Sequence, residues 1–148
     1  MLALAWEAYA ELVAVEGSVL THLPDGLNLV DSAAIPLVAL TGDQLMRLAA
    51  RAQRGQTLLV TGAVGSVGRA AVHTAKKLGV NVIAGVRARQ LAEARTLGVS
   101  DTVAIDDDSA IAGLAMVDGV ADTVGGETAA NLFGRVKDKS MRATKTKA

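Results

Sequence analysis

The sequence predicts an α/β fold built on a doubly wound parallel sheet, and two features carry this prediction. Short apolar runs typical of buried strands alternate along the 148 residues with segments of helical spacing, which is the order of successive βαβ units. Only three residues are aromatic, Trp6, Tyr9 and Phe133, although 51% of the chain is hydrophobic. The core must therefore be aliphatic, as is usual for parallel strands covered by helices on both faces.

Composition excludes several classes of function. The 15 basic and 15 acidic side chains balance, so no global field favours nucleic acid or an anionic membrane. No cysteine is present and His22 and His73 lie far apart, so we expect neither disulfides nor a metal site. No apolar run is long enough to span a membrane, and residues 1–5 are too short for a signal peptide. We therefore expect a cytoplasmic protein with no nucleic-acid or membrane partner.

The N-terminal part is expected to contain a strand, a turn and a first helix. Residues 8–15 have the composition of a strand, and the Pro and Gly of residues 23–26 mark a turn. The helix that follows is expected to be capped by Asp31 or Ser32, with Pro36 in its first turn.

A second helix is expected over residues 44–52, because residues 41–43 interrupt the helical pattern. Thr41 or Asp43 would cap it, and Gly55 would close it. Its predicted buried face consists of Leu45, Leu48, Ala49 and Ala52.

Beyond position 56 the alternation of strands and helices is regular. The predicted strands are residues 57–61, 80–84, 102–105 and 117–123. The predicted helices are residues 69–79, 91–97, 109–114 and 127–136. Residues 137–148 cannot supply two further strands, so a Rossmann-type sheet is predicted to be incomplete at its C-terminus.

A glycine-rich turn between the strand at 57–61 and the next helix is the main candidate site. A tight glycine turn lets a phosphate approach the backbone, and the following helix offers unpaired N–H groups to the anion. The candidate phosphate-binding residues are Gly62, Ala63, Val64, Gly65, Ser66, Val67 and Gly68. A glycine-rich turn without a ligand is the alternative. Ala63 occupies the usual place of the first glycine, which a slightly wider turn would tolerate.

The chain resembles the medium-chain dehydrogenases/reductases, and most closely their zinc-independent quinone oxidoreductase branch. The motifs that carry the resemblance occur in the family's order: LPDG at 23–26, AAIP at 33–36, LTG at 40–42, LVTGAVGSVG at 59–68 and DTVGG at 122–126. The resemblance covers about residues 8–136.

The resemblance implies three regions. Residues 1–30 correspond to a remnant of a GroES-like catalytic domain with its connecting turn, and residues 31–136 to the NAD(P)-binding domain. Residues 137–148 form a basic tail, which we interpret as a solvated end rather than a binding arm. The basic side chains near this end are Arg135, Lys137, Lys139, Arg142, Lys145 and Lys147. Most of the family's catalytic domain and its last strands have no counterpart here, so a fragment or truncated product is the simplest account.

The residues after the second predicted strand favour NADP(H) over NAD(H). A carboxylate near this point binds the ribose 2′-hydroxyl in NAD-binding folds, but residues 84–90 contain no acid. Arg87 and Arg89 would instead pair with a 2′-phosphate. Solvated loop arginines are the alternative.

Further sequence features bear on the cofactor site. By resemblance, Thr41 and the run Thr123, Val124 and Gly125 lie on the nicotinamide side, although ordinary caps or turns would also explain them. We interpret residues 106–108, three consecutive aspartates, as a solvated loop near the adenine. His73 has no carboxylate close in sequence, so we interpret it as structural.

The resemblance implies reduction of a quinone or activated alkene by NADPH in a longer protein, with a homodimer as the family's common assembly. The sequence indicates no general acid, and this segment alone is expected to bind cofactor weakly and to be inactive. A non-catalytic NADP(H)-binding or interaction module is the alternative. A short-chain dehydrogenase is excluded, because no tyrosine follows Tyr9 to form the Tyr-x-x-x-Lys pair.

Overall fold

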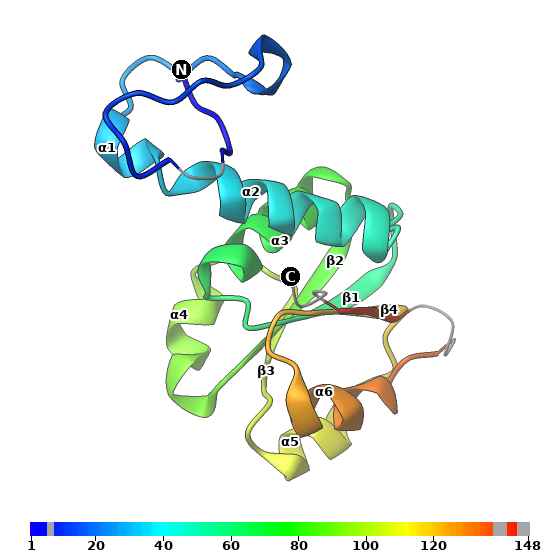
Figure 1. Cartoon of the computed structure of the whole chain (residues 1–148). Coiled ribbons are helices and arrows are strands. Elements are labelled where there is room, and N and C mark those ends of the chain that lie inside the picture. Colours follow the sequence, from blue (N-terminus) through cyan, green and yellow to red (C-terminus); the bar gives the residue numbers. More distant parts are fainter. Residues whose placement is uncertain (6–7, 138–141, 145–148) are drawn as a thin grey trace.

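The computed structural model describes residues 1–5, 8–137 and 142–144, and its centre is a parallel sheet (Figure 1). The strands are β1 (Thr57–Thr61), β2 (Asn81–Val86), β3 (Asp101–Ala104), β4 (Gly119–Asp122) and β5 (Arg142–Thr144). Their order across the sheet is β3-β2-β1-β4-β5, and every neighbouring pair is parallel. The order reverses beside β1, which confirms the predicted doubly wound α/β fold.

Helices cover both faces of the sheet. They are η1 (Gly17–Val19), α1 (Leu29–Ser32), α2 (Ile35–Gln44), η2 (Leu45–Ala49), α3 (Ser66–Lys77), η3 (Ala88–Gln90), α4 (Leu91–Arg95), α5 (Asp108–Gly113) and α6 (Gly126–Phe133). On one face α2, α3 and α4 lie over the strands, and α5 and α6 lie on the other (Figure 1). The two faces carry separate aliphatic clusters, as the scarcity of aromatic residues predicts.

Strand β1 is the centre of the core. Leu58 and Val60 pack into the cluster beneath α3, and Leu59 into the cluster above α5 and α6. All three side chains are fully buried, which is why this strand reads as a continuous apolar run rather than an alternating one.

The predicted strand at residues 8–15 is wrong. The described residues of this segment form no strand, and Leu12 and Val13 are exposed. The segment lies in the N-terminal region near α1 and away from the sheet (Figure 1), so it has no strand beside it to satisfy its backbone groups. Leu2 and Thr21 form an isolated antiparallel bridge instead.

The first helix begins earlier than predicted. Asn28, rather than Asp31 or Ser32, is the N-cap of α1, and its side-chain oxygen accepts from the amides of Val30 and Asp31. Ser32 is buried, and its hydroxyl donates to the Asn28 carbonyl. Pro36 lies in the first turn of α2, as predicted.

The predicted break at residues 41–43 is also wrong, because α2 continues through it. Thr41 donates its hydroxyl to the Leu37 carbonyl at 2.7 Å, so it supports the helix interior. Gly42 is buried against α3, where a Cβ at position 42 would lie 2.6 Å from the Ala70 Cβ. The interruption that the sequence indicates is therefore a helix–helix contact.

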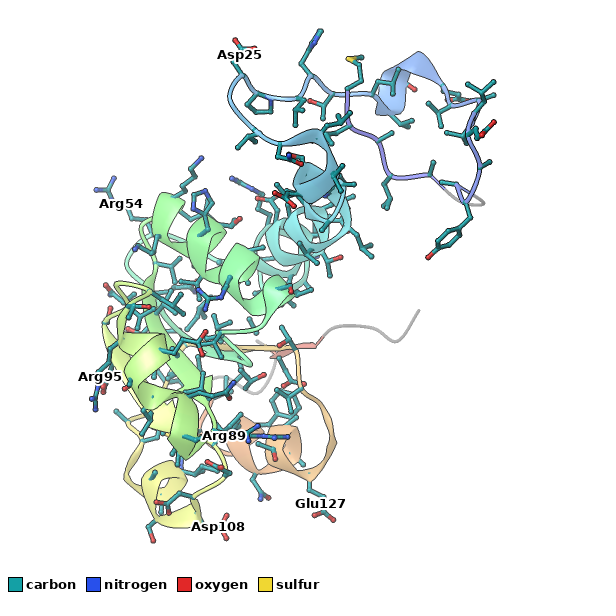
Figure 2. All side chains as sticks on the ribbon, turned by 90° about the vertical axis from the view of Figure 1, so that its left-hand side faces the viewer. Asp25, Arg54, Arg89, Arg95, Asp108 and Glu127 are labelled. Atoms are coloured by element: carbon teal, nitrogen blue, oxygen red, sulfur yellow. The ribbon has the colours of Figure 1, made fainter. Side chains whose placement is uncertain are left out.

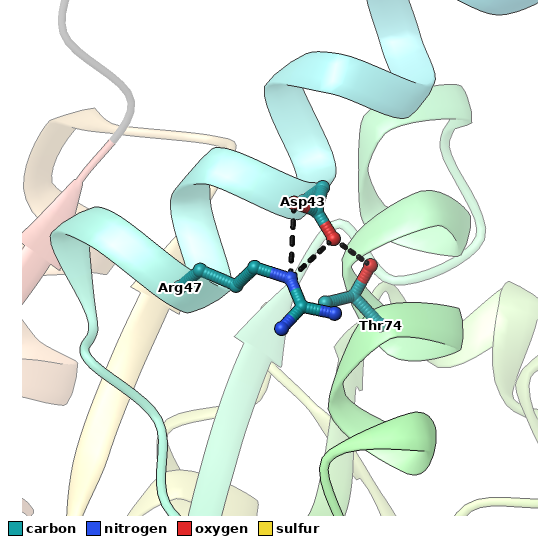
Figure 3. Close-up of polar contacts among 3 residues, drawn as sticks. All are labelled: Asp43, Arg47 and Thr74. Atoms are coloured by element: carbon teal, nitrogen blue, oxygen red, sulfur yellow. Dashed lines mark hydrogen bonds and ion pairs between the residues drawn. The ribbon is translucent and has the colours of Figure 1, made fainter.

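Asp43 does not cap a helix but connects α2 to η2 and α3 through its side chain. Its oxygens accept from Arg47 Nε in η2 at 2.9 and 3.1 Å, and from the Thr74 hydroxyl in α3 at 3.1 Å (Figure 3). The hydrogen bond from Arg47 lowers the pKa of Asp43 below its usual value.

The end of this helix is a π-helical turn, η2. A π turn shifts the phase of the buried face, so Met46 and Ala50 are buried with Leu45, whereas Leu48 and Ala49 are exposed. The chain then leaves the helix through Arg51, which has a φ of 46°. Gly55 is not the helix stop, since it lies in the turn that leads into β1.

The remaining elements agree with the prediction to within a few residues, with β5 as the exception. Residues 142–144 pair with β4, although the sequence predicts no strand after position 136. Lys139, Lys145 and Lys147 of the predicted basic tail lie outside the described residues. No helix in the described part of the chain is long and apolar enough to cross a membrane.

Candidate functional site

The glycine turn connects β1 to α3 at the carboxyl edge of the sheet. Gly62 leaves β1 in the left-handed region, with a φ of 62°, and the Gly65 amide donates to the Gly62 carbonyl at 2.8 Å. Gly65 then serves as the N-cap of α3. The predicted order of strand, tight turn and helix is confirmed.

Close packing between the turn and α3 depends on Gly68. A Cβ added at position 68 would lie 2.1 Å from the Gly62 carbonyl oxygen and 2.8 Å from the Ala63 Cα. Any side chain there would push the helix off the turn. Ala63 is fully buried and packs into the core beneath α3, which accounts for alanine at this position.

The N-terminus of α3 has the features of an anion site. No side chain among the described residues caps this end of the helix, so backbone N–H groups of the first turn at Ser66 and Val67 stay available to a ligand. The positive end of the helix dipole lies at the same point, and Lys76 and Lys77 occupy the opposite end.

The two candidate 2′-phosphate residues follow β2, with Arg87 in the connection and Arg89 in η3. Arg87 and Arg89 are both exposed, and in Figure 2 the Arg89 side chain extends to the opposite side of α4 from Arg95. Gln90 Oε1 accepts from the Arg87 amide at 3.3 Å, and Asp106 Oδ1 accepts from the Ala88 amide at 2.8 Å. Asp106 therefore fixes the backbone that carries both arginines, a role that sequence reasoning missed.

A buried polar network joins the carboxyl ends of β1 and β4. The Thr61 hydroxyl donates to Asp122 Oδ1 at 2.5 Å and accepts from the Thr123 amide at 2.9 Å. Asp122 also accepts from the amides of Val124 and Gly125, at 3.2 and 2.9 Å. Thr123 lies against Gly62, since a Cβ on that glycine would stand 2.5 Å from the Thr123 hydroxyl. The loop at 123–125 and the glycine turn are thus in direct contact.

The comparisons with known proteins agree with this geometry. No family model matches the chain. A quinone oxidoreductase from Pseudomonas aeruginosa is 38% identical over 97 residues, which are 65% of this chain and 30% of the relative. The erythronolide synthase EryA2 of Saccharopolyspora erythraea is 32% identical over 101 residues, 68% of this chain and 3% of the synthase.

Solved structures give the same result. The quinone oxidoreductase from Thermus thermophilus, whose structures include a complex with NADPH, superposes with a TM-score of 0.70 at 30% identity, covering 86% of this chain and 43% of that one. The CurK enoyl reductase has a TM-score of 0.73 at 22% identity, covering 80% and 37%, and this likeness shows the fold alone.

The chain belongs to the medium-chain dehydrogenase/reductase superfamily. It spans less than a third of the length of the quinone oxidoreductase it matches. The resemblance inferred from the sequence motifs is therefore confirmed at the level of the superfamily.

The structure brings most of the predicted site residues of this superfamily member to one edge of the sheet. Thr41 lies on α2, where its neighbour Gly42 abuts Ala70 and Ala71 in α3. Its hydroxyl is already used within α2. Which of these residues contact a cofactor stays a prediction.

Two other sequence features lie outside the site. Asp107 caps α5 by accepting from the amides of Ser109 and Ala110, and His73 is exposed on α3. The described residues hold no group of acidic or histidine side chains suited to a metal.

The residues that sequence reasoning missed are Thr61, Asp122 and Asp106. The available signal was position, because a hydroxyl ends β1 and a carboxylate ends the otherwise apolar β4. A separate hollow of about 560 Å³ lies along β3, between α4 and α5, lined in part by Leu91, Val103 and Leu114. It is not part of the glycine turn.

Proposed function

We propose that this chain is the NADP(H)-binding part of an NADPH-dependent quinone or enone reductase. The carrying observation is the closely packed glycine turn at the uncapped N-terminus of α3, with Arg87 and Arg89 on the neighbouring loop. Bound NADPH would supply a hydride, and the protein would supply orientation. The activity belongs to a longer protein, of which this chain corresponds to a part.

The order of the strands indicates how a dinucleotide would lie. The glycine turn after β1 would hold the pyrophosphate at the helix N-terminus, through the backbone amides of Ser66 and Val67. Strand β2 lies on one side of β1 and β4 on the other. The adenosine half would therefore extend over the end of β2, and the nicotinamide half over the end of β4.

The preference for NADP(H) rests on charge. Guanidinium groups bind a 2′-phosphate with charge-assisted hydrogen bonds, and both arginines are exposed on a loop whose backbone is held by Gln90 and Asp106. The residues that would contact the cofactor are Thr41, residues 62–68, Arg87, Arg89 and residues 123–125.

The proposal also covers the division into domains, the substrate, the cellular location and the oligomeric state. Residues 1–30 would be the remnant of a GroES-like catalytic domain, residues 31–136 the NADP(H)-binding domain, and residues 137–148 a basic tail. The substrate would be a small quinone or activated alkene. The whole protein would be a cytoplasmic enzyme that could form a homodimer through the edge of its sheet.

Fluorescence titration tests the cofactor assignment. NADPH is expected to bind the 148-residue chain about tenfold more tightly than NADH, because NADH lacks the phosphate that the arginines would bind. Equal affinities would contradict the assignment. In the longer protein, NADPH should be oxidised only when a quinone or enone acceptor is added. Binding without oxidation would favour the second candidate, a non-catalytic NADP(H)-binding module.

A further inference from the structure

The buried polar network at the ends of β1 and β4 connects Thr61 and Asp122 to the loop at residues 123–125. Thr61 and Asp122 end two neighbouring parallel strands and face each other across them, as the pairing of Val60 with Ala121 one residue earlier requires. Both are buried, with 0% and 1% of their surface exposed. A carboxylate is costly at such a position unless donors surround it.

Two of the donors to Asp122 belong to the loop that it precedes. The amides of Val124 and Gly125 both donate to this one carboxylate, and the Thr61 hydroxyl donates to it across the strands. Gly125 takes a φ of 79°, a backbone conformation that glycine adopts readily. The carboxylate thus dictates the path of the loop backbone.

Thr61 fixes the same loop from the other strand. Its hydroxyl accepts from the Thr123 amide, and its carbonyl accepts from the Thr123 hydroxyl at 2.8 Å. Thr123 and Val124 then press on Gly62, where a Cβ would lie 2.5 and 3.2 Å from their side chains. These bonds place the loop, and with it the Thr123 and Val124 side chains, relative to the glycine turn. The Val124 side chain remains 55% exposed to solvent.

We propose that Thr61 and Asp122 are positioning residues that hold the 123–125 loop in place for the nicotinamide half of the dinucleotide. This inference rests on the proposed function, since it assumes that a dinucleotide lies across the turn. It assigns the pair to one half of the ligand, because β4 and β2 lie on opposite sides of β1. The adenosine half, over β2, would not depend on the pair.

Two ligands separate these halves. NADPH contains both, and adenosine 2′,5′-bisphosphate contains the adenosine half with its 2′-phosphate but no nicotinamide. Dissociation constants for both are measured by amide NMR titration of the 148-residue chain. The Thr61→Val variant keeps the shape of the side chain but removes both hydrogen bonds of its hydroxyl.

We expect Thr61→Val to weaken NADPH binding about tenfold and to leave the bisphosphate unchanged within about twofold. Thr61→Ser, which restores the hydroxyl, should bind both ligands like the wild type. The matched control is Thr74→Val, since Thr74 is also a buried threonine that donates to an aspartate, at a contact between α2 and α3. It should change stability without changing the ratio of the two affinities.

The outcomes distinguish the two proposals. A wild-type chain that binds neither ligand overturns the proposed function, and this inference with it. If the wild type binds both, an unchanged ratio in Thr61→Val, or the same change in Thr74→Val, overturns the inference alone.

A second variant and a second measurement cover the case in which Thr61→Val does not fold. Asp122→Asn keeps the size of the side chain but removes one acceptor, and the same selective loss of NADPH affinity is expected. Hydrogen exchange needs no variant: the amides of residues 123–125 should already be protected in the free wild-type chain. Unprotected amides there would contradict a loop positioned in advance.

Discussion

The carbonyl oxygen of Gly62 occupies the space in which a side chain at position 68 would begin. A Cβ on Gly68 would lie 2.1 Å from this oxygen, so the first turn of α3 rests directly on the backbone of the glycine turn. The nearest atoms belong to the backbone rather than to a flexible side chain, so they cannot move aside without shifting the turn itself. This contact sets the distance between the helix N-terminus and β1.

Replacing Gly68 by alanine should therefore destabilise the fold by about 2 kcal/mol, the cost typical of overpacking, and should also weaken NADPH binding by displacing the helix. Urea unfolding measures the first effect and cofactor titration the second. Gly113→Ala is the matched control, because a Cβ there has no heavy atom within 4 Å. A Gly68→Ala protein as stable as Gly113→Ala would show that the turn and α3 are not in this contact.

Arg87→Ala and Arg89→Ala should each weaken NADPH binding by about tenfold, since each would remove charge-assisted hydrogen bonds to the 2′-phosphate. NADH carries no such phosphate, so its affinity should stay within about twofold of the wild type. The control is Arg95→Ala, whose side chain extends from the other side of α4 (Figure 2). Loss of affinity for both nucleotides alike would indicate a structural effect of the arginines instead.

Stability at low pH should depend on Asp118. Its Oδ1 accepts from Lys137 Nζ at 2.8 Å and its Oδ2 from the Thr57 amide at 2.7 Å. These bonds, the one from Lys137 first, lower the pKa of Asp118 in the folded chain below the ordinary 3.8. A lowered folded pKa stabilises the fold above the unfolded value, and this contribution is lost as the pH falls through the folded value.

The test is the difference in unfolding free energy between about pH 6 and about pH 3. Asp118→Asn should reduce this difference, because the asparagine does not titrate. Lys137→Gln should reduce it only in part, since the Thr57 amide still donates to the carboxylate. An equal loss of stability in wild type and Asp118→Asn would mean that Asp118 does not contribute.

The cap of α1 provides a local test. Asn28→Ala should cost about 1 kcal/mol, because the amides of Val30 and Asp31 both lose their side-chain acceptor. The sequence suggested Asp31 as a cap, but Asp31 does not cap the helix in the structure. Asp31→Ala should therefore reduce the free energy of unfolding by less than Asn28→Ala. Thermal unfolding of the two variants compares them directly, and a larger cost for Asp31→Ala would contradict the assignment of the cap.

Local pattern was enough to predict the part of the fold around the glycine turn. Strand β1 is a continuous apolar run bounded by the turn, and the spacing from Gly62 to Gly68 has few structural interpretations. The errors arose where contacts distant in sequence decide the outcome. Gly42 looks like a helix break until Ala70 is placed against it, and residues 142–144 become a strand only because β4 lies beside them.

The candidate site was predictable to the same extent. The turn and the two arginines follow from residues adjacent in sequence. The bond from Thr61 to Asp122 joins residues 61 positions apart, and the bond from Ala88 to Asp106 joins residues 18 positions apart. Neither bond leaves a signal in local spacing, so only the fold shows which of these residues are partners.

The central claim is that the glycine turn binds the pyrophosphate of NADP(H), and mapping NADPH onto the amide NMR spectrum of the chain tests it most directly. We expect saturable shifts at the amides of residues 62–68, with further shifts at 87–89 and 123–125, and smaller shifts with NADH at 87–89. Absence of saturation, or shifts confined to the hollow along β3 between α4 and α5, would contradict it.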